Sequence, residues 1–140
     1  MKKLFLVLPF LFLTNCSGGD DVNTNNFLLN VGVNASINLN LPEYSHLMFT
    51  SNSVYIPNQG NLGIYVMNVG SGYRAWDAAD PNHIPDTCSF LQRTDATITC
   101  GCTDENSYSL FTGQSLGTAL PFGLKEYRVT VSGSTIVVSN

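Results

Sequence analysis

Apolar and polar residues alternate in the first strongly patterned stretch of the chain, between residues 33 and 41. Its apolar positions, each separated from the next by one polar residue, are Val33, Ala35, Ile37, Leu39 and Leu41. A period of two places all of these side chains on one face of a β-strand. Pro42 cannot donate a backbone hydrogen bond and is expected to end the strand.

Short β-prone segments continue along the chain, separated by turn-forming residues. We expect further strands at Leu47–Thr50, Val54–Ile56, Leu62–Val69, Tyr73–Trp76, Ala96–Thr99, Leu124–Val131 and Thr135–Val138. The segment 62–69 is apolar almost throughout, which favours a central strand. Ser132-Gly133-Ser134 predicts a hairpin between the last two segments, because glycine readily adopts a positive φ. No stretch keeps a 3.6-residue period, so the pattern predicts an all-β fold of small antiparallel sheets.

The N-terminus has the features of an export signal. Met-Lys-Lys precedes the apolar run Leu4–Leu13, which is too short to span a bilayer. The following Leu13-Thr14-Asn15-Cys16 resembles the bacterial lipobox, with Cys16 as the lipidated residue. We therefore expect a signal peptide over residues 1–15, a flexible tether over 16–30 and one domain over 31–140.

This organisation predicts a lipoprotein of the bacterial outer membrane, attached to the membrane through its lipid anchor. Asp20 and Asp21 in the tether resemble the acidic signals that send some Gram-negative lipoproteins to the cell surface; an ordinary solvated linker is the alternative. The side of the membrane, periplasmic or cell-surface, therefore stays open. We expect an envelope protein as partner.

Charge and motifs exclude several function classes. Once Lys2 and Lys3 leave with the signal peptide, four basic residues face ten acidic ones, a net charge of −6. No basic patch remains, which argues against binding to nucleic acid. The sequence also contains no Gly-x-Ser-x-Gly elbow, P-loop or dinucleotide fingerprint. We therefore expect no enzymatic activity.

The stretch Ala75–Gln114 holds the only tryptophan, one of two histidines and every cysteine after Cys16. Two loops mark it, Asp80–Cys88 and Cys100–Thr103, which together we call the clasp. With the segments AWDAA, CGC and YSLFTGQ, this stretch resembles the Rieske iron–sulfur proteins. The resemblance implies an antiparallel β sandwich or barrel with an inserted two-loop cluster subdomain, at about residues 77–115.

The ligand positions that the resemblance implies are mostly changed. A Rieske [2Fe–2S] cluster, the family's cofactor, needs two thiolates on one iron and two imidazoles on the other. These positions fall on Asp80, Asn82, Cys100 and Thr103, with His83 one residue late. Oxygen donors replace thiolate and imidazole poorly at such a site. We therefore expect no cofactor; if a cluster or metal is present, its ligands would come from Asp80, His83, Cys100, Cys102 and Thr103.

Three cysteines remain in the predicted domain. Export places them in an oxidising compartment, where a disulfide is expected. Cys100 and Cys102 are separated only by Gly101, and a bridge between such close neighbours would be strained. This leaves Cys88–Cys102 or Cys88–Cys100, and the resemblance implies Cys88–Cys102, with Cys100 left as a free thiol.

The function hypotheses follow from these loops. The first is a lipid-anchored envelope protein whose Rieske-like domain has lost its cluster and acts as a disulfide-stapled binding or assembly module. The second is a [2Fe–2S] electron-transfer protein with an altered ligand set. Two further hypotheses are a mononuclear zinc or copper site of Cys100, Cys102, His83 and Asp80, and thiol–disulfide exchange by Cys100.

Overall fold

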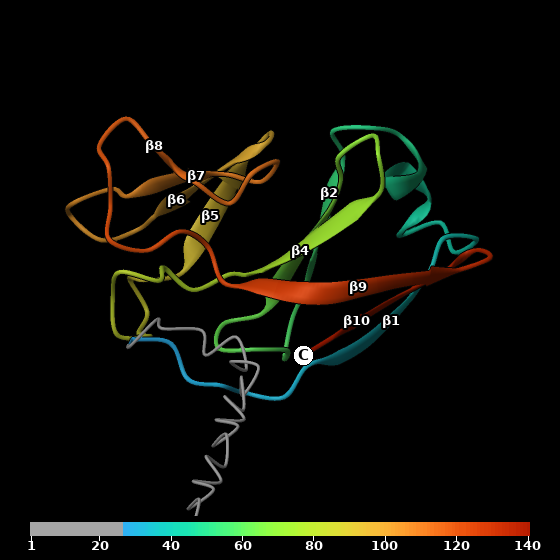
Figure 1. Cartoon of the computed structure of the whole chain (residues 1–140), viewed down its shortest axis with the longest axis horizontal. Coiled ribbons are helices and arrows are strands. Elements are labelled where there is room, and N and C mark those ends of the chain that lie inside the picture. The colour runs from blue at the N-terminus through green and yellow to red at the C-terminus, as the bar shows by residue number, and fades with distance from the viewer. Residues whose placement is uncertain (1–26) are drawn as a thin grey trace, which may run out of the picture.

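The computed structural model describes residues 27–140, so the expected signal peptide, Cys16 and most of the expected tether lie outside the described residues. The described part consists of strands, turns and one short 3-10 helix (Figure 1). Its elements are β1 (Asn34–Asn38), η1 (Ser45–Met48), β2 (Ser53–Ile56), β3 (Ile64–Asn68), β4 (Tyr73–Asp77), β5 (Leu91–Thr94), β6 (Thr97–Cys100), β7 (Ser107–Ser109), β8 (Ser115–Leu116), β9 (Glu126–Ser132) and β10 (Thr135–Ser139). The all-β fold class is confirmed. Between residues 27 and 140 no helix is long and apolar enough to cross a membrane.

The strands form two antiparallel sheets. One has six strands in the order β1-β10-β9-β4-β3-β2, and the other has four in the order β5-β6-β7-β8. The four-stranded sheet is inserted in the sequence between β4 and β9, which pair directly through Ala75 and Tyr127. It therefore projects as a separate lobe from the six-stranded sheet, at the upper left of Figure 1, and both clasp loops belong to this lobe.

Strands β3 and β4 divide two hydrophobic cores. Every residue of β3 is buried, because Ile64 and Val66 point into one core while Tyr65 and Met67 point into the other. Burial on both faces explains why this segment is continuously apolar, and it confirms the expected central strand. Trp76 on β4 packs in the second core, under the lobe, and its Nε1 donates to the Leu110 carbonyl at 2.8 Å.

The first and last strands follow the expected alternation. In β1, Ala35 and Ile37 are buried between exposed polar residues, and Ile37 pairs with Ile136 of β10. The hairpin between β9 and β10 is confirmed, with Gly133 at φ 57°. Leu41, however, is exposed rather than on the buried face, because β1 ends at Asn38 and a turn follows.

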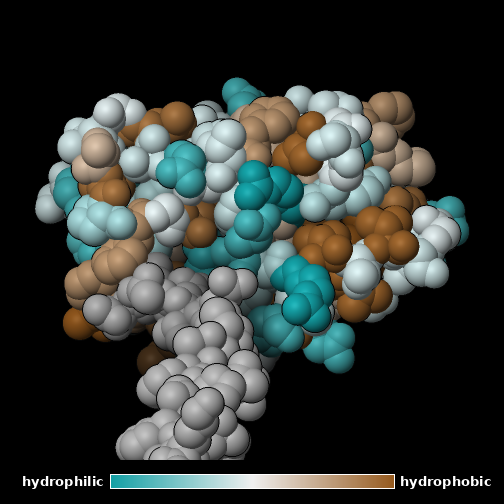
Figure 2. Space-filling model, viewed as in Figure 1, coloured by the Kyte–Doolittle hydropathy of each residue, from teal (hydrophilic) through white to brown (hydrophobic). Residues whose placement is uncertain are grey.

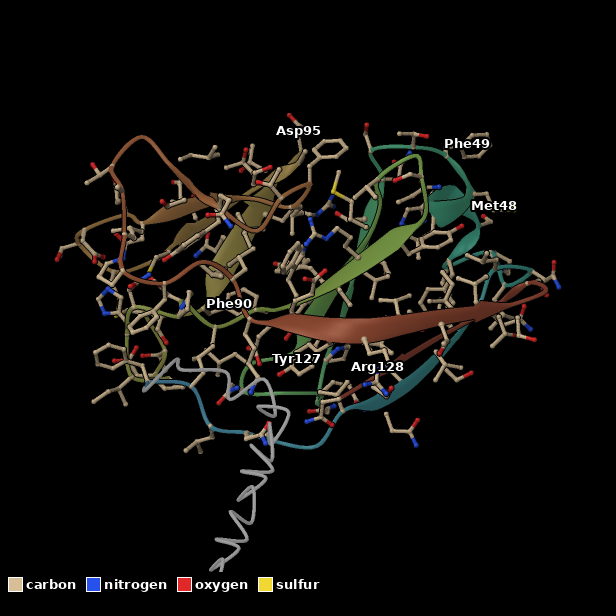
Figure 3. The ribbon with its side chains drawn as sticks, viewed as in Figure 1. Met48, Phe49, Phe90, Asp95, Tyr127 and Arg128 are labelled. Carbon is tan, nitrogen blue, oxygen red and sulfur yellow. A yellow bond between two sulfur atoms is a disulfide. The ribbon has the colours of Figure 1, made fainter. Side chains whose placement is uncertain are left out.

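The expected strand at Leu47–Thr50 is wrong, because this segment begins inside η1. Its backbone makes i→i+3 hydrogen bonds, such as Leu47 N–H to the Tyr44 carbonyl at 2.9 Å. Within residues 47–50, Leu47 is the only buried residue. The Leu47 carbonyl accepts a hydrogen bond from the Asn68 side chain at 2.8 Å. Met48 and Phe49 point outward at the end of the molecule remote from the lobe (Figure 3). A single apolar anchor suits one helical turn better than an alternating strand.

A buried carboxylate lies at the base of the lobe, at the end of β4. Asp77, the last residue of β4, is fully buried. Its Oδ2 accepts from the Tyr127 hydroxyl at 2.6 Å and from Asn61 backbone and side-chain N–H groups at 2.9 and 2.8 Å, and its Oδ1 accepts from Ala79 N–H. Tyr127 lies on β9, close to where that strand meets the lobe (Figure 3). This network fixes the position from which the first clasp loop departs.

Candidate functional site

The two clasp loops are joined covalently. Cys88 and Cys102 form a disulfide, with their Cα atoms 4.8 Å apart, and Cys100 is a free, buried cysteine. This confirms the Cys88–Cys102 pairing that the family resemblance implied, and not the alternative Cys88–Cys100 pairing. The loops also touch through their backbones: a Cβ at Gly101 would lie only 3.0 Å from the Cys88 carbonyl oxygen. The disulfide thus fastens two loops that are already in close contact.

Asp80 occupies the centre of the clasp. Its side chain is fully buried, and Oδ1 accepts from the Tyr108 hydroxyl at 2.5 Å and from Asn82 N–H at 2.9 Å. Its Oδ2 accepts from Asn106 Nδ2 at 3.0 Å. Burial first, and then the hydrogen bond to Asp80, raise the pKa of Tyr108, so this hydroxyl stays protonated and donates. A buried carboxylate with this many donors is satisfied by the protein itself.

Asn82, at an implied imidazole position, is also fully engaged. Its Nδ2 donates to the Tyr108 hydroxyl and to the Phe122 carbonyl, both at 2.8 Å. Its Oδ1 accepts from Phe122 N–H at 3.1 Å. Asn82 therefore ties the first clasp loop to the segment that precedes β9, a structural role that leaves none of its polar groups for a ligand.

His83 faces the second clasp loop. Its Nε2 lies 2.6 Å from Asp104 Oδ2 and 3.7 Å from Asp80 Oδ2. The hydrogen bond to Asp104 is the main cause that raises the pKa of His83, and the Asp80 charge adds to it against the opposing effect of burial. Asn106 Nδ2 donates to both carboxylates, at 3.0 Å to Asp80 and 2.9 Å to Asp104. Two carboxylates, one imidazole and one amide thus form a continuous polar cluster.

Cys100 is a poor nucleophile in this setting. Its residue is 3% exposed, and burial raises the pKa of the thiol to about 12, with the Asp80 and Asp104 carboxylates adding to the effect and the Cys102 backbone N–H opposing it. The thiolate is the form that attacks a disulfide. The structure therefore disfavours the hypothesis that Cys100 performs thiol–disulfide exchange.

The donor set does not fit a [2Fe–2S] cluster. Such a cluster needs two thiolates and two imidazoles, whereas the clasp offers one free thiol, Cys100, and one imidazole, His83. Asp80 and Asn82 are occupied by hydrogen bonds within the protein. Thr103 is exposed at the surface, and its hydroxyl is a poor replacement for an imidazole at an iron–sulfur cluster.

The structure gathers a different set of potential ligands from the one expected. The side-chain donor atoms of His83, Cys100, Cys102 and Asp104 all lie within 4.8 Å of one another. Asp104 takes the place that the sequence analysis gave to Asp80 and Thr103. Asn106 and Tyr108, which organise the two carboxylates, were also missed. The available signal was the spacing Cys-x-Cys-x-Asp-x-Asn over residues 100–106, which places polar groups at alternate positions.

Comparisons with known proteins give only distant structural similarity. No family model matches the chain, and no curated protein matches it. One similar solved chain comes from the complex of reduced oxygenase and oxidised ferredoxin in carbazole 1,9a-dioxygenase, at 16% identity and TM-score 0.48, covering 81% of this chain and 93% of that one. The ferredoxin of carbazole 1,9a-dioxygenase from Nocardioides aromaticivorans IC177 has 17% identity and TM-score 0.44, covering 74% and 96%. Similarity at this level assigns no cofactor, partner or activity to the chain.

The polar cluster makes a pH-dependent contribution to stability. A histidine whose pKa is raised in the folded state stabilises the protein below the unfolded pKa of about 6.5, and this contribution is lost as pH rises through the folded pKa. We expect wild type to exceed His83→Asn in stability at about pH 5–6 and to lose that advantage at higher pH. Because the pair is partly exposed, the difference should stay below about 1 kcal/mol.

The measurement is chemical denaturation of both proteins at several pH values, with a metal chelator present. The variant Asp104→Asn is the matched control, because it removes the partner and keeps the histidine. It should lose most of the pH dependence that His83→Asn loses, with a small remainder from the Asp80 charge near His83. A wild-type advantage that grows with rising pH would show that the imidazole is not stabilised in its charged form.

Proposed function

We propose that the chain is a lipid-anchored outer-membrane protein whose Rieske-like domain carries no [2Fe–2S] cluster and acts as a disulfide-stapled module for binding or assembly with another envelope protein. The observation that carries this proposal is the buried Asp80 carboxylate, which accepts hydrogen bonds from Tyr108, Asn82 and Asn106 at an implied cluster-ligand position. The protein thereby fills with its own polar groups the place where the family resemblance puts a ligand.

The disulfide supports the same proposal. In an exported protein the Cys88–Cys102 bridge is expected to persist, and it removes Cys102 from the thiolates available to iron. The clasp is thus held together without a cofactor. The polar cluster and the disulfide both hold the two clasp loops together, so the lobe presents a rigid surface.

Exposed apolar side chains at the end of the molecule remote from the clasp support the proposed contact with a partner. Apolar side chains gather at the right of the view in Figure 2, over the end of the six-stranded sheet remote from the lobe. Three large apolar residues of η1, the position after it and β9 are each at least half exposed: Met48, Phe49 and Val131. Exposed apolar patches of this kind are typical of protein–protein contacts.

The anchor part of the proposal comes from the N-terminal sequence alone. Leu13-Thr14-Asn15-Cys16 resembles a lipobox, and the acylated cysteine of such proteins carries enough lipid for stable anchoring. The intact mass of the protein purified from membranes tests this point. We expect the mature chain to begin at Cys16 and to carry the added mass of its acyl groups.

Iron and acid-labile sulfide analysis of the full-length protein tests the central claim. The protein should be produced in a bacterium with intact cluster assembly and lipoprotein processing, and purified in detergent without oxygen. We expect a colourless preparation, iron far below one equivalent, and no electron-paramagnetic signal after reduction with dithionite.

The variant Cys100→Ser, analysed in parallel, gives the result a clear contrast. It removes the only free thiol of the clasp, so any cluster that depends on it would disappear. Two iron and two sulfide per chain in wild type, lost in Cys100→Ser, would overturn the proposal and establish the [2Fe–2S] electron-transfer alternative.

A further inference from the structure

Four potential metal ligands meet at the junction of the two clasp loops. Nε2 of His83, Sγ of Cys100, Sγ of Cys102 and a carboxylate oxygen of Asp104 all lie within 4.8 Å of one another. Ligands of a tetrahedral zinc ion, bound at about 2.0–2.3 Å, are separated by about 3.3–3.8 Å. The observed separations therefore approach those of a formed zinc site.

The state of Cys102 decides whether this set is complete. In the oxidised protein its sulfur is bonded to Cys88, and only three of the four groups are effective donors. We propose that the clasp is a redox-gated zinc site: when the Cys88–Cys102 bridge is reduced, Cys102 joins His83, Cys100 and Asp104 to hold one Zn²⁺ ion. Nitrogen, sulfur and carboxylate oxygen are all accepted zinc ligands.

The groups around this set support metal binding. Asn106 Nδ2 donates to Asp104 Oδ2 at 2.9 Å, which orients the carboxylate. The backbone N–H of Cys102 donates to Cys100 Sγ at 3.4 Å, a contact that would stabilise a metal-bound thiolate. Outer hydrogen bonds of this kind position metal ligands. The side chains of His83 and Asp104 are 31% and 44% exposed, so an ion can enter from solvent.

The gating reaction is a two-electron thiol–disulfide exchange. A dithiol reductant gives two electrons and two protons to the Cys88–Cys102 bridge, forms two thiols there, and becomes a cyclic disulfide itself. Zn²⁺ then displaces one proton from the Cys100 thiol and one from the Cys102 thiol as it binds. Nε2 of His83 must also give up its hydrogen to bind the ion: a neutral ring then carries its hydrogen on Nδ1, and a charged ring releases one further proton to solvent. Cys88 is left as a free thiol, so reoxidation of Cys88 with Cys102 by a disulfide oxidant, which takes up the two electrons and is itself reduced to thiols, would expel the ion.

The inference rests on the proposed function in one respect, because Cys100 cannot ligate iron and zinc at once. The proposed function and the zinc-site proposal are tested by different measurements, so one can fail without the other. Iron and sulfide in the protein as isolated would overturn the proposed function, whereas zinc titration of metal-free protein tests the gated site whatever the iron content.

A matched pair of variants isolates the fourth ligand. Cys88→Ser and Cys102→Ser both lose the bridge, but only Cys88→Ser retains the Cys102 thiol. Full-length proteins in detergent would be titrated with Zn²⁺ alone in competition with a chromophoric chelator. We expect Cys88→Ser to bind one Zn²⁺ without any reductant, about 100-fold or more tighter than Cys102→Ser and oxidised wild type.

Cobalt substitution supplies a structural readout. Co²⁺ in Cys88→Ser should show thiolate-to-metal charge transfer in the near ultraviolet and the visible bands of a tetrahedral site. Both signals should weaken strongly after a second substitution, His83→Asn. If Cys88→Ser does not fold, wild type and Cys102→Ser reduced with a phosphine replace the pair, with the same expectations.

Equal zinc affinity in Cys88→Ser and Cys102→Ser would overturn the proposal, because Cys102 would then contribute nothing. Retention of tight zinc binding when His83→Asn or Asp104→Asn is added to Cys88→Ser would overturn the proposal as well. So would tight stoichiometric zinc binding by the oxidised wild type, since the site would not be gated by the bridge.

Discussion

Replacing Asp80 by alanine is expected to lower the free energy of unfolding by about 3–5 kcal/mol. The substitution leaves the Tyr108 hydroxyl and the Asn82 N–H without their acceptor, and each buried donor without a partner costs about 1–3 kcal/mol. It also removes one of the two carboxylates that Asn106 bridges. The loss should appear as a lower midpoint in urea with an unchanged slope, since the fold remains cooperative.

Two milder substitutions test the origin of this loss. Asp80→Asn retains one acceptor oxygen and should cost less than the alanine variant. Tyr108→Phe removes the hydroxyl that donates to Oδ1 at 2.5 Å. In a double-mutant cycle with Asp80→Asn, the two losses should be coupled by at least about 1 kcal/mol, because the residues touch. If the losses simply add, or if Asp80→Ala unfolds like wild type, then Asp80 does not hold the clasp together.

Replacing Cys88 by serine is expected to cost about 3 kcal/mol in metal-free buffer, by the chain-entropy estimate for a loop of this length. The bridged residues are separated by 14 positions, so the oxidised unfolded chain is restricted in proportion to that loop. Thermal unfolding of wild type and Cys88→Ser with a chelator present measures the difference. Reduced wild type should melt close to the variant.

The control for this prediction is Cys100→Ser, which changes a cysteine of the second clasp loop without breaking a disulfide. Its melting temperature should fall much less than that of Cys88→Ser. Coincident melting of wild type and Cys88→Ser under oxidising conditions would mean that the bridge does not form in solution. The zinc site then would not be gated by oxidation.

The fold was largely predictable where burial follows a simple period. The alternation in β1, the continuous apolar run of β3 and the glycine-centred hairpin of β9 and β10 each report a local constraint that the residues themselves carry. The segment 45–50 was not predictable in this way. Leu47 is its one buried apolar anchor, and the carbonyl of Leu47 is satisfied by the Asn68 side chain from β3, which no local pattern reveals.

The candidate site was only half predictable. Resemblance to the Rieske loops identified Cys88, Cys102 and the changed ligand positions, because these are features of local spacing. It did not identify Asp104 as the partner of His83, which lies 21 residues away in the sequence. It also gave Asp80 the role of a substitute ligand, whereas the structure makes Asp80 the acceptor for Tyr108, 28 residues away.

The sequence by itself determined the β architecture and the two cysteine-bearing loops, since side-chain periodicity and turn residues act over a few neighbouring positions. Only the tertiary structure decided what the loops hold between them. Folding buries the carboxylate of Asp80, and a buried charge must find its donors wherever the chain supplies them.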